Sequence, residues 1–380
     1  MNKINIWLFL LVLLTAAGCK DPFDMELRSS DKSLLVVDGF LNKGAVSRFQ
    51  LSRSIPLTDR AQLKPELRAV LTVEGKDNTT AAFTERSNGV YEANLVNLEV
   101  GKDYRLRIRT ADGKEYLSDY VTVKNNPPID DVTWREEDNG VRIYTSTHDP
   151  SNNTLYYRWD FEETWEIHSY FTSHYKHIGG GVVVERDMAT EDISVCWKNA
   201  PSTTIVLASS AQLNADVIKD APVTHIERRN EKLAHRYSIL MKQYALSKEA
   251  YEYLQIMKKN TESIGTIFDP QPSEVTGNIR SVSDPEEQVV GFVYATSVQQ
   301  KRMFISSRDL TGNGFMMSCL TIEVPNNRSE LLSAFTSGYV PYEAKTHPLN
   351  PLIITDYYAS TAYCVDCTSR GGTTVRPSFW

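Results

Sequence analysis

Apolar and polar residues alternate in short stretches through the first third of the chain. In 104–109, Tyr104, Leu106 and Ile108 would lie on one face of a strand, with arginines on the other. Turn sequences such as Asn88-Gly89 separate this stretch from similar short runs at 34–37, 48–52, 69–74, 90–93 and 120–123. Short strands at regular spacing predict a β-sandwich over 34–125, which ends at the Asn-Asn-Pro-Pro sequence that follows.

Strand patterns continue in the second part of the chain, and one helical pattern interrupts them. Residues 155–161 are rich in aromatic side chains, as strands often are. After Ser247, a suitable N-cap, apolar residues recur at helical spacing at Ala250, Leu254 and Met257. We therefore predict a mainly β protein of two Ig-like or transthyretin-like β-sandwich domains. The second domain spans 126–380 and carries a helical insertion near 247–262.

Composition and charge narrow the classes of function. The chain has 380 residues, of which 41% are hydrophobic and 23% charged, so it is long enough for more than one globular core. The formal net charge is −7, and no basic stretch is present. Because nucleic-acid binding rests on neutralising phosphates with Lys and Arg, we expect no nucleic-acid partner.

The first 19 residues have the layout of a bacterial lipoprotein signal. Lys3 precedes an apolar run over 6–14, and small residues then lead to Cys19. The run is too short for the ~20 residues that a membrane-spanning helix needs. We expect residues 1–18 to be removed as a signal peptide, Cys19 to become the acylated N-terminus, and 19–33 to form an acylated tether. The alternative is an ordinary signal peptide that leaves a free cysteine.

Four cysteines remain beyond the signal, namely Cys196, Cys319, Cys364 and Cys367. An even number in an oxidising compartment predicts disulfides. Three pairings are possible, and we favour Cys196–Cys319, which closes a long loop, with Cys364–Cys367 as a tight clasp. A metal site at Cys364–Cys367 would need a second ligand pair, and redox activity would need a thioredoxin-like context. The sequence indicates neither.

An aromatic-rich stretch over 155–175 is the candidate surface for a ligand or a partner. Exposed aromatic side chains stack on sugars and peptides and are common at protein interfaces. The stretch also partly alternates, which favours the alternative that its side chains fill a sandwich core. The candidate surface residues are Tyr157, Trp159, Trp165, Tyr170 and Phe171.

Three histidines in the same region are a possible metal site. His168, His174 and His177 lie within ten residues of one another. A strand would place His174 and His177 on opposite faces, so a loop or a helical turn would have to bring the imidazoles together. An aromatic surface loop is the alternative, and we expect no bound metal.

Acidic residues among the aromatic ones raise the question of hydrolysis. Glu162, Glu163 and Glu166 could supply paired carboxylates, but a glycoside hydrolase needs two carboxyl groups ~5–10 Å apart, which spacing in sequence does not fix. Acidic residues between strands are more often solvated. The chain has no nucleophile elbow, zinc-binding helix motif or phosphate-binding loop. We therefore predict a protein that is not an enzyme and needs no cofactor.

Several motifs, taken in their order along the chain, resemble a known family. The first, LLVVDGFL, covers 34–41, and the last, CVDCTSRGGTT followed by PSFW, covers 364–380. Between them lie motifs at 51–54, 127–130, 268–272 and 277–280. Together they resemble the Bacteroidota lipoprotein family catalogued as domain of unknown function 4249.

The resemblance implies an outer-membrane lipoprotein, typically encoded beside a large TonB-dependent receptor. Asp21, Asp24 and Glu26 in the tether resemble the acidic signals that send such lipoproteins to the cell surface. We therefore expect a non-catalytic accessory of a TonB-dependent transporter in nutrient capture. The alternative is a free-standing surface lipoprotein that binds glycans or peptides. The family supplies no catalytic residues.

Overall fold

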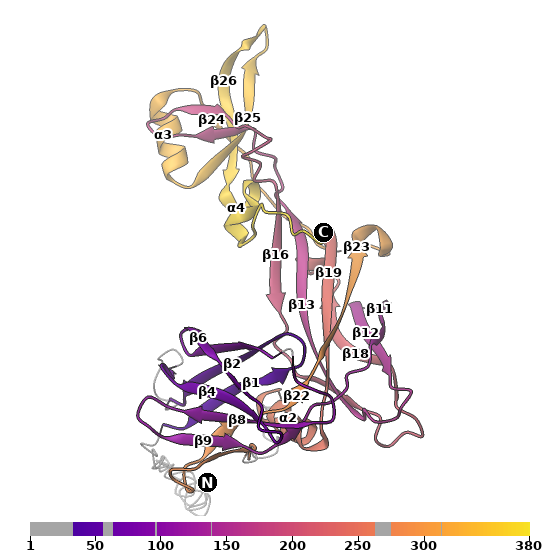
Figure 1. Cartoon of the computed structure of the whole chain (residues 1–380). Helices are drawn as coiled ribbons and strands as arrows, with labels where there is room; N and C mark the ends of the chain where they lie inside the picture. The colour runs from indigo at the N-terminus through magenta and orange to yellow at the C-terminus, as the bar shows by residue number, and fades with distance from the viewer. Residues whose placement is uncertain (1–32, 56–63, 96, 138, 263–274, 313) are drawn as a thin grey trace, which may run out of the picture.

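The computed structural model describes residues 33–55, 64–95, 97–137, 139–262, 275–312 and 314–380. Strands dominate this part of the chain, which confirms the expectation of a mainly β protein. The elements form an elongated body of three parts, which we call the first sandwich, the spine and the distal unit (Figure 1). Within the described residues, no helix is both long and apolar enough to cross a membrane.

The first sandwich has two sheets with one core between them. The first sheet has the order β21 (Val289–Gly291), β1 (Leu35–Asn42), β2 (Val46–Arg53), β7 (Val90–Asn94) and β6 (Thr84–Ser87), with β22 (Ala295–Thr296) and β3 (Lys64–Pro65) at its sides. The second has the order β20 (Ile279–Ser281), β9 (Glu115–Ser118), β8 (Asp103–Arg109), β4 (Val70–Gly75) and β5 (Thr80–Ala82), with β10 (Val121–Thr122) beside β8. Alternate side chains point inward, and they include Phe49, Leu71, Tyr91, Ile108 and Tyr116.

Residues 279–296, which lie far along the chain from the other strands, complete the first sandwich. β21 and β22 pair in parallel with β1, and β20 pairs antiparallel with β9. The structure thus divides the chain differently from the predicted boundary between 34–125 and 126–380. Each returning strand is only two or three residues long, which is too short to show a recognisable alternation in the sequence.

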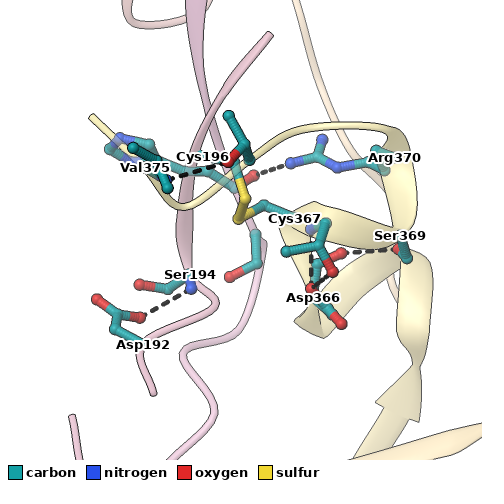
Figure 2. Close-up of a disulfide and its surroundings, with 12 residues drawn as sticks. Asp192, Ser194, Cys196, Asp366, Cys367, Ser369, Arg370 and Val375 are labelled. Atoms are coloured by element: carbon teal, nitrogen blue, oxygen red, sulfur yellow. Dashed lines mark hydrogen bonds between the residues drawn. A yellow bond between two sulfur atoms is a disulfide. The ribbon is translucent and has the colours of Figure 1, made fainter. Parts of the chain in front are cut away.

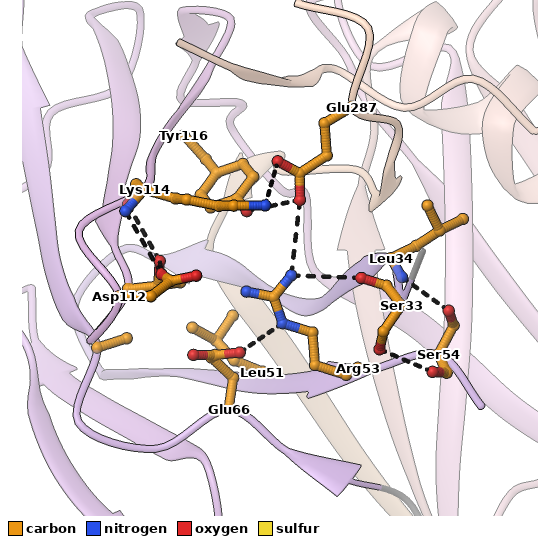
Figure 3. A network of polar contacts seen from close by, with 12 residues as sticks. Ser33, Leu34, Leu51, Arg53, Ser54, Glu66, Asp112, Lys114, Tyr116 and Glu287 are labelled. Carbon is orange, nitrogen blue, oxygen red and sulfur yellow. Dashed lines mark hydrogen bonds and ion pairs between the residues drawn. The ribbon is translucent and has the colours of Figure 1, made fainter. Parts of the chain in front are cut away.

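A network of polar contacts fixes the returning segment to the first sandwich (Figure 3). Glu287 from the returning segment accepts a hydrogen bond from the Tyr116 hydroxyl at 2.9 Å and pairs with Lys114 at 3.0 Å. Its carboxylate also lies 3.7 Å from the guanidinium of Arg53, which pairs with Glu66 at 2.5 Å. Burial, helped by the bond to Glu287, raises the pKa of Tyr116 to about 12. The segment is therefore held by charge as well as by strand pairing.

The spine consists of a sheet of long strands packed on a smaller sheet. The long sheet has the order β16 (Val195–Pro201), β13 (Tyr156–His168), β19 (Arg236–Ala245) and β23 (Val298–Ser306), with β17 (Val206–Ser209) also on β13. The smaller sheet has the order β11 (Ile129–Glu137), β12 (Gly140–His148) and β18 (Val217–Glu227). Both sheets contribute to one core, with Ile143 from β12 beside Trp159, Tyr237 and Met241 from the long sheet.

The distal unit lies at the end of the spine that is farther from the first sandwich (Figure 1). Its sheet has the order β24 (Ile322–Pro325), β26 (Asn350–Thr361) and β25 (Tyr339–His347). The helix α3 (Arg328–Thr336) and the hairpin of β14 (Tyr175–His177) and β15 (Val183–Glu185) pack on it. After β26, the chain forms α4 (Ala362–Val365) and the 3-10 turn η3 (Cys367–Arg370) and returns along the spine. Two further 3-10 turns are η1 (Glu231–Leu233) and η2 (Ser307–Asp309).

The predicted helix is present as α2 (Lys248–Glu262), and it lies at the joint between the first sandwich and the spine. Ala250 is its buried residue and packs with Leu246 and Tyr294. Phe40 from β1 joins the same cluster. The helix therefore bridges two units, because its apolar positions face residues from both of them.

All four predicted cysteines form disulfides, but the favoured pairing is wrong. The bonds are Cys196–Cys367 and Cys319–Cys364, with Cα–Cα distances of 5.7 and 5.9 Å. Figure 2 shows Cys367, which follows α4, beside Cys196 on β16. Farther along, the C-terminal segment pairs with the same strand at Thr373. The route of this segment back along the spine decides the pairing, and cysteine spacing does not reveal that route.

Candidate ligand-binding groove

Three of the five predicted surface aromatics belong to the core of the spine. Tyr157 and Trp159 are fully buried, and Trp165 is 7% exposed. They occupy alternate positions on β13 and point to its inner face. The Tyr157 hydroxyl donates to Asp216, and the Trp159 indole donates to Gln243, both at 2.9 Å. Their burial confirms the favoured alternative, in which alternating side chains fill a sandwich core, so these three are not surface residues.

The other two predicted aromatics lie where the spine meets the distal unit. Tyr170 is 55% exposed and contacts Phe171 edge-on. Phe171 stacks on Tyr342 from β25 at 4.2 Å between ring centroids. The backbone N–H groups of both residues donate to the carbonyl of Cys364. These rings therefore pack the joint of the distal unit and do not extend the buried set on β13.

The three histidines do not converge. His168 stacks on His235 at 3.6 Å between ring centroids and bonds to Glu166 at 2.7 Å. His174 and His177 lie instead beside and within the β14–β15 hairpin. Among the described residues there is no group of three side chains that could hold a metal ion. Burial lowers the pKa of His235, and the neighbouring His168 lowers it further, which favours a neutral His235.

Each of the three carboxylates on β13 is engaged by other side chains. Glu162 pairs with Lys242 on the neighbouring strand. Glu163 is buried and accepts a hydrogen bond from the Tyr237 hydroxyl at 2.8 Å. Glu166 pairs with the His168 ring on one side and accepts from the indole of Trp380 at 2.9 Å on the other. Glu163 lies on the opposite face of the strand from the other two, so the three do not form one facing group.

A groove of about 470 Å³ lies between α2 and the outer face of the first sheet of the first sandwich. Since odd-numbered residues of β1 fill the core, the even-numbered ones face this groove. The sheet contributes Val36, Asp38, Phe40, Arg48, Gln50, Val290 and Phe292, and α2 contributes Tyr253, Leu254 and Met257. Arg158 and Ile205 reach it from the spine. The first sandwich, α2 and the spine therefore all line the same groove.

Aromatic contacts shape the apolar wall of the groove. Phe40 stacks on Tyr294 at 5.3 Å between centroids and meets Tyr244 edge-on at 5.2 Å. On the other side, Phe292 packs on Tyr253 of α2 at 5.2 Å. These rings come from the first sandwich, the returning segment, the spine and α2. Mutual packing across all four segments favours a hollow that exists before any ligand arrives.

Arg158 supplies a partly buried charge on the spine side of the groove. Its guanidinium bonds to both carboxylate oxygens of Asp160, at 2.8 and 2.9 Å, and to the Tyr294 hydroxyl at 3.0 Å. It also lies over the Tyr244 ring at 5.3 Å. Burial opposes the charge, but Tyr294 and Asp160 hold the pKa of Arg158 above its ordinary value. Arg158 is thus a fixed, compensated charge that joins the units.

The outer part of the groove carries two opposite charges of its own. In the β1–β2 register, Asp38 lies opposite Gln50 and Phe40 lies opposite Arg48. Asp38 and Arg48 are therefore diagonal neighbours on the same outer face, and both are exposed. Neither forms an ion pair with another described residue, whereas Arg158 pairs with Asp160 and Lys242 pairs with Glu162 nearby. Both charges remain free for a ligand.

A second, more polar hollow of about 320 Å³ adjoins the groove and shares Arg158 and Ile205 with it. Its wall contains the hydroxyl residues Ser202, Thr203 and Thr204. Sequence reasoning missed both hollows, because the walls of each come from several segments that are separate in the sequence. The one local signal is Asp38, a charge within the apolar run at 34–41 that would otherwise predict a strand buried on both faces.

Comparison with known proteins gives one family match. The model of a family described as "Domain of unknown function (DUF4249)" matches residues 20–302. No curated protein matches the chain. Among solved structures, the FN1–FN3 domains of chicken CNTN1 align at 12% identity over 56% of this chain, with a TM-score of 0.20. The chain spans 62% of that structure's length.

Proposed function

Because this chain belongs to the family of the domain of unknown function 4249, we propose that it is a non-catalytic outer-membrane lipoprotein that helps a TonB-dependent transporter to capture a nutrient. The proposal includes a lipid anchor at Cys19, which lies outside the described residues, and an orientation toward the cell surface. It also includes Ig-like or transthyretin-like architecture for the two sandwich-forming units.

The groove at the joint is the observation that supports a capturing role. Its volume of about 470 Å³ lies within the ~300–1,000 Å³ that small-ligand sites occupy. Its walls are mostly apolar, with a few polar groups, which is the usual composition of such sites. The side chains that could react, Glu162, Glu163 and Glu166, lie on β13 and are held by other partners. Binding thus accounts for the groove without a chemical step.

The long shape suits a protein that holds a ligand near the membrane and meets a partner farther out. The described chain starts at Ser33 in the first sandwich, at the end of the body opposite the distal unit (Figure 1). Thirteen residues, 20–32, would separate Cys19 from Ser33, and at ~3.6 Å per residue this stretch reaches at most about 50 Å. The first sandwich would then lie close to the membrane, with the distal unit directed away from it.

The tip of the β25–β26 hairpin is the surface that we assign to the transporter. Leu349 is 91% exposed and Leu352 is 90% exposed. From 346 to 355 the sequence contains no Asp, Glu, Lys or Arg. Large apolar side chains without nearby charge are typical of the centre of a protein interface. The lipid of the chain's own membrane is not the proposed contact, because the tip lies at the other end of the body.

Purification from the native outer membrane tests this function. The tagged chain is recovered in mild detergent from cells that carry either the natural sequence or Leu349→Asp with Leu352→Asp. We expect a TonB-dependent barrel in near-equal amount with the natural chain and its loss with the variant. Recovery of the lipoprotein alone, under conditions that preserve a known transporter complex, contradicts the proposal.

The second candidate is a free-standing surface lipoprotein that binds glycans or peptides. The same groove favours it, since its open, partly polar hollow could retain a ligand without a partner. The two candidates differ in the purification experiment. A free-standing binder would show ligand affinity but would not bring a barrel with it.

A further inference from the structure

We propose that the groove binds short peptides with apolar side chains, with the peptide amine at Asp38 and the peptide carboxylate at Arg48. This inference deepens the proposed function, on which it rests, because it names the class of nutrient captured. It is carried by two unpaired opposite charges placed at the outer part of an apolar hollow.

The spacing of the two charges suits the two ends of a short peptide. Diagonal neighbours on adjacent strands have Cβ atoms ~7–8 Å apart. Asp38 and Arg48 hold this relation in the β1–β2 register. An extended chain advances ~3.3 Å per residue, so a dipeptide or tripeptide brings its amine and carboxylate to a similar separation.

The remaining walls match apolar side chains. Leu254 and Met257 of α2 line the hollow together with Phe40 and Phe292. Met257 is unbranched and adapts to different shapes, which suits a site that accepts several side chains. Arg158 and Asp160 compensate each other, so they add no net charge that a ligand must match.

Other classes of ligand would leave part of this site unmatched. A fatty acid would bring its carboxylate to Arg48 but would leave the Asp38 carboxylate without a counter-charge. A neutral glycan would satisfy neither charge by ion pairing. A zwitterion is the class that matches both, and the strongest hydrogen bonds are those between ionised groups.

Calorimetry with defined peptides tests the inference. The mature chain in lipid nanodiscs is titrated with the dipeptide Leu-Phe and the tripeptide Leu-Leu-Phe, each in free, N-acetylated and C-amidated form. Maltotriose is the glycan probe. We expect binding of the free peptides, an affinity at least about tenfold lower when either end is capped, and no binding of maltotriose.

Two variants test which side chain binds the amine of the peptide and which binds its carboxylate. Asp38→Asn should weaken the free peptide about tenfold and leave the acetylated peptide unchanged, because that peptide has no charged amine to lose. Arg48→Gln should also weaken binding of the free peptide about tenfold and should leave binding of the amidated peptide unchanged, because that peptide has no charged carboxylate to lose. The control, Arg109→Gln, removes an exposed arginine from the other sheet of the sandwich and should change neither affinity.

Equal affinity for free and capped peptides would overturn the inference, as would no peptide binding at about 1 mM or binding of maltotriose alone. These outcomes are separate from those of the purification experiment. If the transporter is recovered but peptides do not bind, the accessory role stands and only the ligand class is wrong. If peptides bind but no barrel is recovered, the free-standing alternative is correct.

Discussion

The first sandwich and the distal unit are stabilised by different kinds of interaction. The first sandwich has an extensive core between two sheets, and its segments, 34–125 and 279–296, contain no cysteine. The buried cluster of the distal unit is much smaller and consists of Val324, Leu331, Phe335, Tyr357 and Ala359 among the described residues. Both disulfides lie at the junction of this unit with the spine. A small core gains from cross-links that a large core does not need.

The two regions also differ in what they expose. The first sandwich covers much of its outer face with α2 and leaves a groove with two free charges. The distal unit projects a hairpin tip that is apolar and uncharged. The groove is large enough for a small ligand, and the hairpin tip resembles a protein interface. One chain can therefore make two separate contacts, one at each end.

The largest effect is expected from the core of the first sandwich. Phe49→Ala removes a fully buried ring and should lower the free energy of unfolding by about 3–5 kcal/mol. Val46→Ala on the same strand, at a half-exposed position, is the matched control and should change it by less than about 1 kcal/mol. Guanidinium unfolding followed by fluorescence measures both. Equal losses would show that the core does not carry the stability of this region.

Removing the bond between Cys319 and Cys364 should destabilise the distal unit alone. The bond closes a loop with a sequence separation of 45, and the double change to Ser should cost about 2–4 kcal/mol. Hydrogen exchange should accelerate in β24–β26 and stay unchanged in β1 and β2. If exchange accelerated equally in both regions, the distal unit would not be a separate unit of stability.

Glu287→Gln tests the polar link to the returning segment. The substitution keeps the shape but removes the charge that faces Lys114 and Arg53, and we expect a loss of about 1–3 kcal/mol. Glu286→Gln, one residue earlier and exposed, is the control. Thermal unfolding of both variants gives the comparison. An equal effect of the two variants would count against the network.

The stability of the first sandwich should depend on pH in the alkaline range. The pKa of Tyr116 is raised from 10.0 to about 12, first by burial and then by the bond to Glu287. The folded state therefore holds the phenol proton more tightly, so this contribution is complete below pH 10 and is lost as pH rises from 10 to 12. Tyr116→Phe should unfold with a weaker pH dependence over this range. An unchanged slope would contradict the assignment.

The smallest effect on stability is expected at the hairpin tip. Leu349→Asp and Leu352→Asp replace side chains that are almost fully exposed, so each should change the free energy of unfolding by no more than about 0.5 kcal/mol. Their effect should appear only in recovery of the transporter. A large loss of stability would show that the tip supports the fold and is not free for a partner.

The spacing of apolar residues along the sequence correctly predicted several individual strands and one helix. The alternation at 104–109 became β8, and the helical spacing after Ser247 became α2. The strand pattern at 155–161 was also correct, but the choice of its exposed face was not, because alternation fixes two faces without saying which one meets a second sheet.

The features that escaped prediction depend on segments far apart in the sequence. The strands of 279–296 pair with β1 and β9, from which most of the spine separates them in the sequence. The cysteine pairing follows the return of the C-terminal segment along β16. The groove is a third case, since its walls come from four segments: the first sandwich, the spine, α2 and the returning segment. In each case the determining contact is long-range and leaves no periodic trace.

Photo-cross-linking in native outer membranes tests the division of roles most directly. A photoreactive phenylalanine analogue is placed at Leu349 in the tip or at Val46 in the first sandwich, two positions that are both exposed. The account predicts a cross-link from position 349 to a TonB-dependent barrel and none from position 46. A barrel cross-linked from position 46 alone, or from neither position in cells where the transporter is expressed, would contradict it.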